Sequence, residues 1–229
     1  MDGVTHPRRQ HGITLIELLV SMVILGVVTT MLLVGWTSLQ KSYAHSVKSN
    51  NARAEVRDAM ARVSREIRDA QPVALTSPPS SPFTLANPNE VVFYSAFNNA
   101  GARSDGTGLG ALLLTRVYLD TSGSAAQKTL YWQRDTNASG GFDGADRTIV
   151  LARNIVNTSL PSTGSPTPVF TYGYRDGSGD FMATTTIASA DLAKIVSVQI
   201  HLIADANLSQ APAPADLQTT VLPRNAPLR

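Results

Sequence analysis

The feature that most constrains the fold is an apolar run from Ile13 to Trp36 that contains one charged residue, Glu17. A helix rises ~1.5 Å per residue, so a helix of this length exceeds the ~30 Å hydrocarbon core of a bilayer. Its residues are apolar on every side, which disfavours a core helix of a soluble protein. The run therefore predicts a membrane-spanning helix over residues 13–36.

Basic residues precede the apolar run. Arg8 and Arg9 stand before it, and no comparably basic stretch follows until Lys41 and Lys48. Because cytoplasmic flanks carry the excess of Lys and Arg, this asymmetry predicts a cytoplasmic N-terminus and an exported remainder. A cleaved secretory signal has an apolar region of only ~7–15 residues, followed by a small-residue cleavage site. In this chain the run is longer, and the small residue, Gly12, comes before it.

Glu17 is the anomalous residue of the run. A carboxylate inside hydrocarbon costs roughly 2.5–3.5 kcal/mol on insertion scales, so it usually has a partner or a function. Cleavage after Gly12 would place the new α-amine of Ile13 one helical turn from Glu17, at i and i+4. The amine of the same chain or of a neighbouring chain could then neutralise the acid.

These residues resemble the class III signal of type IV pilins and of the pseudopilins of type II secretion. In that signal a basic leader ends in Gly, and a hydrophobic residue and Thr-Leu-Ile-Glu-Leu-Leu-Val follow. Gly12 and residues 14–20 fit the pattern, while Ile13 stands where the family more often has Phe. The resemblance implies that residues 1–12 are a cytoplasmic leader peptide carrying Arg8 and Arg9. A prepilin peptidase would cut between Gly12 and Ile13 and methylate the amine of Ile13.

The same resemblance implies the partners and the location. The expected partners are other major and minor pilins or pseudopilins, bound through helix packing, together with the prepilin peptidase, an inner-membrane assembly platform and the lipid bilayer. The chain would cross the inner membrane once, with its remainder exported, and then enter a pilus or pseudopilus. Glu17 would set the assembly register, because a misplaced subunit leaves a buried charge unpaired.

The helix is expected to continue past the membrane as an amphipathic segment, residues 37–71. Four apolar residues fall at i, i+4, i+7 and i+11 and mark one helix face: Val56, Met60, Val63 and Ile67. No proline lies between Pro7 and Pro72, so the helix is predicted from about residue 13 to about residue 70.

Charged residues four positions apart lie beside this apolar stripe. The opposite charges pair as Asp58 with Arg62, Arg62 with Glu66, and Arg65 with Asp69. These pairs predict a solvated face on the other side of the helix.

Residues 72–229 are expected to form an exported β-rich globular domain. The Pro- and Ser-rich segment 72–89 predicts a surface loop. Short β-branched and aromatic runs then predict about seven strands: 90–95, 111–119, 129–134, 148–152, 168–174, 195–203 and 217–222. The predicted class is therefore α+β, and the resemblance of the N-terminal residues implies a pilin-like arrangement, with the long N-terminal helix packed on a mostly antiparallel β-sheet.

Strand 195–203 shows the clearest alternation of the predicted strands. One face carries Ile195, Ser197, Gln199, His201 and Ile203. The other face carries Val196, Val198, Ile200 and Leu202, and this apolar set is predicted to be buried.

The β region is similar to minor pilins and minor pseudopilins of the J or W type. The resemblance rests on the order of an Asn-Ile-Val segment at 154–156, a Phe-x-Tyr strand at Phe170, an Asp-Gly turn at Asp176, a late Ile-x-x-Val-x-Ile strand and a closing Arg224-Asn225. The absence of cysteine and the long β region also favour a minor subunit over the bulk fibre protein. Such a subunit would start assembly or cap the tip.

Other motifs give weak indications of chemistry. Asp135, Asn137, Asp143 and Asp146 place oxygen ligands in a Gly-rich loop that Ca²⁺ would accept, although the same residues are typical of any exposed hairpin loop. No cofactor is therefore expected, with calcium as the alternative.

The remaining motifs predict neither nucleic-acid binding nor catalysis. The net charge of +2 gives no nucleic-acid footprint. The glycines at 106, 108 and 110 precede a predicted strand, whereas a dinucleotide-binding loop must follow one. The four histidines are scattered, and the chain has no cysteine nucleophile.

Two classes of function remain open on the sequence. The first is a non-enzymatic minor pilin or pseudopilin that primes or caps assembly, in either a type IV pilus or a type II secretion system. The second is a membrane-anchored exported enzyme or binding protein that uses the helix only as a signal anchor.

Overall fold

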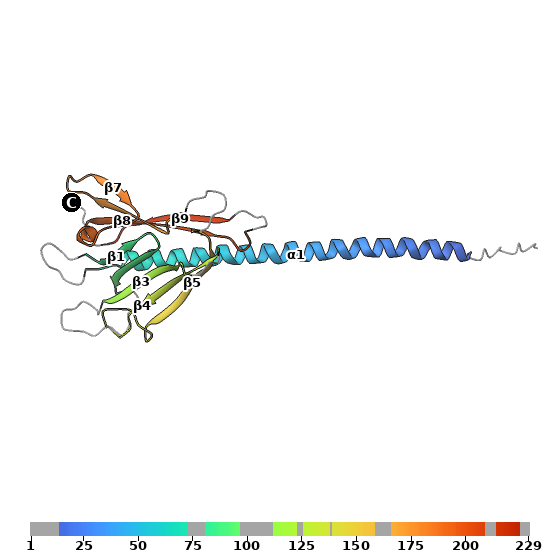
Figure 1. Ribbon diagram of the computed structural model, residues 1–229, viewed down its shortest axis with the longest axis horizontal. Coiled ribbons are helices and arrows are strands. Elements are labelled where there is room, and N and C mark those ends of the chain that lie inside the picture. Colours follow the sequence, from blue (N-terminus) through green and yellow to red (C-terminus); the bar gives the residue numbers. More distant parts are fainter. Residues whose placement is uncertain are drawn as a thin grey trace, which may run out of the picture. The chain divides into compact units, whose positions relative to one another are not determined.

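A computed structural model describes residues 14–72, 81–96, 112–122, 126–137, 139–158, 166–208 and 214–224 (Figure 1). The chain divides into two compact units, Met1–Ser46 and Val47–Arg229. The helix α1, Leu15–Arg68, contributes to both units, and it matches the predicted long helix. Arg65 and Arg68 in its last turn complement the negative end of the helix dipole.

The second unit is a curled antiparallel sheet packed on the C-terminal part of α1, which confirms the predicted α+β class (Figure 1). The described residues form nine strands in the order β1-β2-β3-β4-β5-β8-β6-β7, with β9 paired to β8. The strands are β1 Phe83–Asn87, β2 Glu90–Ser95, β3 Leu113–Asp120, β4 Lys128–Arg134, β5 Arg147–Ile155, β6 Phe170–Arg175, β7 Phe181–Thr184, β8 Ile195–Ala204 and β9 Ala215–Val221. A 3₁₀ turn, η1 Ser189–Lys194, leads into β8.

The prediction of a loop over residues 72–89 is wrong for its second half. Phe83–Asn87 forms β1, which pairs with β2 across the two-residue connection Pro88-Asn89. Phe83 and Ala86 are buried, and this burial stabilises the strand despite the prolines around it.

The prediction also omitted β7. All four residues of β7 are exposed or half-buried, so the strand has no buried alternation in its sequence. It forms because the Asp176 turn brings it alongside β6, where Gly173 pairs with Ala183. Pairing rather than burial therefore defines β7.

The predicted apolar stripe of α1 covers the sheet. Val56, Val63 and Ile67 are fully buried in one continuous core with Phe93, Phe170 and other strand residues. Met60 lies half-buried at the margin of that core. The stripe thus fixes which face of the helix meets the sheet.

Tyr172 of β6 extends the core to the turn between β1 and β2. Its hydroxyl donates to the backbone carbonyl of Asn87 at 2.9 Å, and the side chain is fully buried. Burial raises the pKa of Tyr172 well above its ordinary value, so the phenol stays protonated as the donor.

The alternation of β8 is confirmed at its centre and broken at both ends, because Ile203, predicted to lie on the polar face, is buried together with Leu202 and Ala204. Val198, Ile200 and Leu202 are buried as predicted. Gly173 pairs with Ser197, but the next residue of β6 pairs with Ile195, so Val196 is an extra residue in β8. This bulge reverses the alternation, which buries Ile195 and leaves Val196 half-buried.

Asn157 bridges the place where β8 leaves β6 and meets β5. Its Nδ2 donates to the carbonyl of His201 at 2.8 Å, and its Oδ1 accepts from the N–H of Ile203 at 2.8 Å. The fully buried amide therefore replaces a backbone partner and satisfies two ladder groups of β8.

Candidate functional site

The first turn of α1 is closed by Thr14, which precedes the helix. Its Oγ1 accepts from the N–H of Glu17 at 3.4 Å, and its carbonyl accepts from the N–H of Leu18 at 3.2 Å. This is the geometry of an N-cap residue, and Thr-x-x-Glu is a capping-box sequence. The Thr14–Glu17 part of the predicted prepilin signal therefore also begins the helix.

Glu17 lies in this first turn, where a negative charge is favoured by the positive end of the helix dipole. The other predicted processing residues, Arg8, Arg9, Gly12 and Ile13, lie outside the described residues. Their cleavage, methylation and leader roles therefore stay predictions.

The N-terminal part of α1, from Leu15 to Leu39, exposes all its large hydrophobic side chains. Leu15 itself is 84 % accessible. Within the described chain, α1 is the one helix long and apolar enough to cross a membrane. An apolar surface of this extent marks a membrane or protein contact rather than a solvated face.

The hydroxyl groups of this segment are satisfied inside the helix. Ser21, Thr29 and Thr30 each donate to the carbonyl four residues earlier, at 2.8 Å. Because hydrocarbon offers no hydrogen-bond partner, internal satisfaction of these groups suits a helix in lipid or in a packed bundle.

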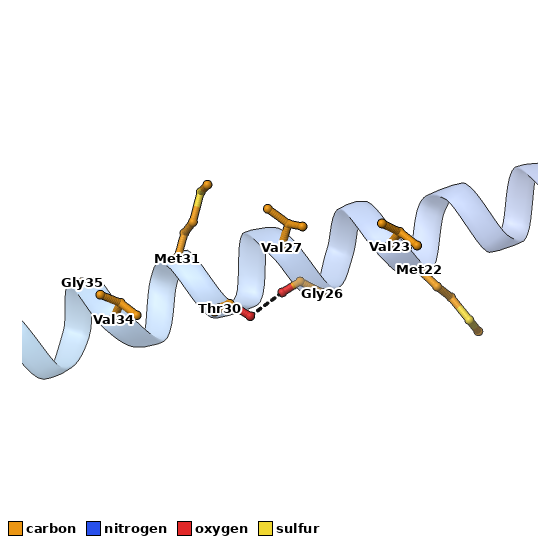
Figure 2. A pocket seen from close by; sticks show the side chains of 8 residues that line it. All are labelled: Met22, Val23, Gly26, Val27, Thr30, Met31, Val34 and Gly35. Atoms are coloured by element: carbon orange, nitrogen blue, oxygen red, sulfur yellow. Dashed lines mark hydrogen bonds between the residues drawn. The ribbon is translucent and has the colours of Figure 1, made fainter.

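Two glycines open a shallow groove along one side of the same segment. The groove runs from Met22 to Gly35 and has Gly26 near its middle (Figure 2). A Cβ added at Gly26 or at Gly35 would meet nothing within 4 Å. Packing inside the described chain therefore requires neither glycine, whereas small residues at a helix surface let a second helix approach closely.

A second polar cluster lies between α1 and the sheet. Arg134 Nη2 donates to Glu66 Oε2 at 2.6 Å, and both side chains are nearly inaccessible to solvent. Ser95 donates to the same carboxylate oxygen at 3.3 Å, and Arg134 Nε donates to Thr115 Oγ1 at 3.3 Å. Burial raises the pKa of Glu66 against the opposing charge of Arg134, and burial lowers the pKa of Arg134.

The prediction that Glu66 belongs to a solvated face is therefore wrong. Its helix position lies three residues after Val63 and one before Ile67, so it shares the buried stripe. Arg62, its predicted partner, instead lies 4.5 Å from the ring centroid of Trp132, in a cation–π contact. The helical spacing of Glu66 from Val63 and Ile67 could have indicated its burial. Its partner Arg134 could not be found in the same way, because it lies 68 residues away in the sequence.

The candidate calcium residues lie in the loop between β4 and β5. The Asp135 carboxylate accepts the N–H groups of Ser139 at 3.1 Å and of Gly140 at 2.8 Å. Asp146 accepts the N–H groups of Thr136 and Asp143 in the same way.

These carboxylates shape the loop by accepting its backbone donors. Asn137 Nδ2 adds a bond of 3.1 Å to Asp143 Oδ2. Among the residues that the structure describes, no group of three or more His, Cys, Asp or Glu side chains is placed to hold a metal ion.

Comparison with known families identifies the N-terminal segment. Residues 7–33 match the family model described as the prokaryotic N-terminal methylation motif. A search of the curated proteins finds no match to the chain. The matched segment contains Thr14, Glu17 and most of the exposed apolar part of α1, so motif and structure together indicate membrane anchoring. The chain therefore carries the class III prepilin signal of the type IV pilin and pseudopilin family.

Proposed function

We propose that the chain is a minor pilin or minor pseudopilin, a structural subunit that primes or caps assembly of a type IV pilus or a type II secretion pseudopilus. The observation that carries the proposal is the methylation motif joined to a helix that exposes apolar side chains on every side and holds Glu17 in its first turn. A helix of this kind would lie in the lipid bilayer before assembly and pack against like helices after it.

The first step of the proposal is processing at the cytoplasmic face. Arg8 and Arg9 keep the leader in the cytoplasm, and the prepilin peptidase cuts between Gly12 and Ile13 and methylates the new amine. Thr14 then remains as the second residue of the mature chain, where it caps α1. The β domain stays on the exported side of the inner membrane.

The second step is transfer of the helix from lipid into a bundle of like helices. Apolar side chains exchange lipid contacts for contacts with neighbouring helices, so the transfer exposes no apolar surface to water. Glu17 pairs with the methylated amine of an adjoining subunit. A register error would leave a buried charge without a partner, which typically costs about 3–5 kcal/mol.

The minor role is proposed from the β region. The order of its strand and turn motifs along the sequence resembles the J or W type, and the chain has no cysteine for the disulfide-bonded loop that major pilins often carry. The role is non-enzymatic in this proposal: the buried Glu66 and Arg134 are used for packing the helix on the sheet.

Complementation tests the assembly role. A host lacking this gene would be supplied with wild type, Glu17→Ala or Glu17→Gln, and fibre formation or type II secretion would be measured with membrane levels of the protein. We expect wild type to restore assembly and Glu17→Ala to restore less than about a tenth at equal membrane level, a deficit of at least ~1.4 kcal/mol. Full restoration by Glu17→Ala would refute the register role.

A further inference from the structure

A small pocket opens on the outer face of the sheet, away from the helix-covered core. It has a volume of about 310 Å³ and lies over β6, β7, β8 and β9. Thr171, Ser197, Gln199 and Thr220 contribute polar groups, and Gly173, Phe181 and Ala183 complete the lining. The volume is at the small end of known ligand sites, of roughly 300–1,000 Å³, so it suits one small ring.

Gly173 creates the space in which the ring of Phe181 sits. A Cβ added at Gly173 would collide with Ser197 Oγ and with the Phe181 ring. The ring is therefore held against the backbone of β6 on one side. It is still 61 % exposed, so most of an aromatic surface faces outward from a fixed position. An exposed aromatic ring that is already positioned loses little conformational entropy on binding.

The polar groups around this ring are aligned by strand pairing. Thr171 of β6 pairs with Gln199 of β8, which pairs in turn with Thr220 of β9. Their side chains point to one face, and Ser197 lies two residues from Gln199 on that face. In the described parts of the chain, these four side chains make no hydrogen bond to protein groups. Their hydroxyl and amide groups can each donate and accept.

The pocket lining carries no charged side chain. A phosphate, a carboxylate or a metal ion would be recognised by charged groups, which are lacking in this lining. A neutral ring-shaped ligand that has C–H groups on one face and hydroxyl groups at its rim fits both the aromatic side and the polar side of the pocket. The C–H face packs on the aromatic ring, and the rim hydroxyls bond to the Thr, Ser and Gln side chains.

We infer that the pocket bounded by Phe181, Gly173 and the Thr171–Gln199–Thr220 row binds a neutral hexose unit of a carbohydrate. The site belongs to the β domain and is independent of helix assembly. A subunit with this site would hold a glycan at the sheet surface while its helix is packed elsewhere.

Titration of the full-length protein with neutral sugars tests the inference. The protein would be kept in a detergent without a sugar headgroup, since a glucoside or maltoside would compete for the pocket. Maltotriose and the N-acetylglucosamine trimer would be added, and saturation-transfer NMR would measure binding. We expect at least one of the two to bind wild type with a Kd of about 1 mM, the weak affinity of a single shallow site.

Three variants locate the binding. Phe181→Ala should weaken it at least about tenfold, and Phe181→Tyr, which keeps the ring, should stay within about twofold of wild type. Met182→Ala is the matched control, because Met182 is also exposed but points to the other face of β7. Thermal unfolding would be followed for each variant, and Phe181→Leu would replace Phe181→Ala if that variant does not fold.

Several results would overturn the site. The first is a wild type that binds neither trisaccharide at about 10 mM, roughly ten times the expected Kd. The second is a folded Phe181→Ala or Phe181→Leu variant that binds as wild type does. The third is an equal loss in Met182→Ala, which would mean that the edge strand as a whole, rather than the pocket, governs binding.

Discussion

Glu66 of α1 and Arg134 of β4 form an ion pair of 2.6 Å inside the interface between helix and sheet, where the Glu66 side chain is 1 % exposed. Ser95 and Thr115 bind the two charged groups from β2 and β3. The cluster thus joins one helix to three strands through side chains only. A one-residue shift of the helix would separate the charges, so the pair fixes how α1 lies on the sheet.

Removing one partner of this pair should be far more costly than removing both. We expect Glu66→Ala to lower the free energy of unfolding of the β domain by about 3–5 kcal/mol, because Arg134 would stay buried and unpaired. The double variant Glu66→Met, Arg134→Met should come within about 1 kcal/mol of wild type, since apolar groups of similar size fill the same space. Urea unfolding measures both, and a double variant no more stable than Glu66→Ala would contradict the account.

The pair also gives a pH dependence whose sign follows from the raised pKa of Glu66. Burial favours the protonated acid in the folded state, while the unfolded acid keeps its ordinary pKa of 4.5. The stabilisation of the folded state that results from this difference is fully present below the ordinary pKa of 4.5. It is lost as pH rises through the raised pKa that Glu66 has in the folded state. Relative to Glu66→Gln, wild type should therefore gain melting temperature as pH falls from 7 toward 4.5. A relative loss over this range would show that Arg134 outweighs burial.

Asn157 should be required for the join between β5 and β8. Asn157→Ala leaves the His201 carbonyl and the Ile203 N–H buried without their partner, and each such group costs about 1–3 kcal/mol. Asn157→Asp should also destabilise, because a carboxylate cannot donate to the His201 carbonyl. Gln218→Ala on the exposed face of β9 is the control and should change stability by less than about 0.5 kcal/mol. Equal unfolding curves for Asn157→Ala and this control would rule the bridge out.

The groove at Gly26 should matter for assembly and not for folding. Gly26→Leu meets no atom of the described chain at the position of its Cβ, so membrane level and the melting of the β domain should match wild type. If a neighbouring helix packs at this groove, the same change should lower fibre assembly several-fold. Met31→Leu, a volume-conserving change in the groove, serves as control. Normal fibre assembly by the Gly26→Leu variant would contradict packing of a neighbouring helix at this groove.

The sequence predicted the parts of the fold that have a local period. The apolar run and the stripe from Val56 to Ile67 identified α1, and each of the seven predicted strands overlaps an observed one. β1 was hidden because prolines surround it, and β7 because an exposed strand has no alternating pattern. In both cases the strand depends on its pairing partner, which the local sequence does not reveal.

The polar sites were harder to predict, since they depend on residues far apart in the chain. Glu66 looked like one half of a surface pair with Arg62, because its true partner, Arg134, lies in β4, 68 residues later in the sequence. Gly173 looked like an ordinary strand residue, although the ring of Phe181 occupies the space that its missing side chain leaves. At the N-terminus the opposite holds: Gly12, Ile13 and Glu17 lie close together in the sequence, so the prepilin signal could be predicted locally, while cleavage at Gly12 stays a prediction.

The intact mass of the membrane-extracted protein tests the central claim most directly. The chain would be produced with and without a prepilin peptidase, and Gly12→Leu would serve as a cleavage-site control. With the peptidase, the wild-type chain should lose residues 1–12 and gain one methyl group, and its first residue should be N-methylated Ile13. Without the peptidase, and in Gly12→Leu, the leader should remain. A wild-type chain that still begins at Met1 in the presence of an active peptidase would contradict the proposal and favour a plain signal anchor.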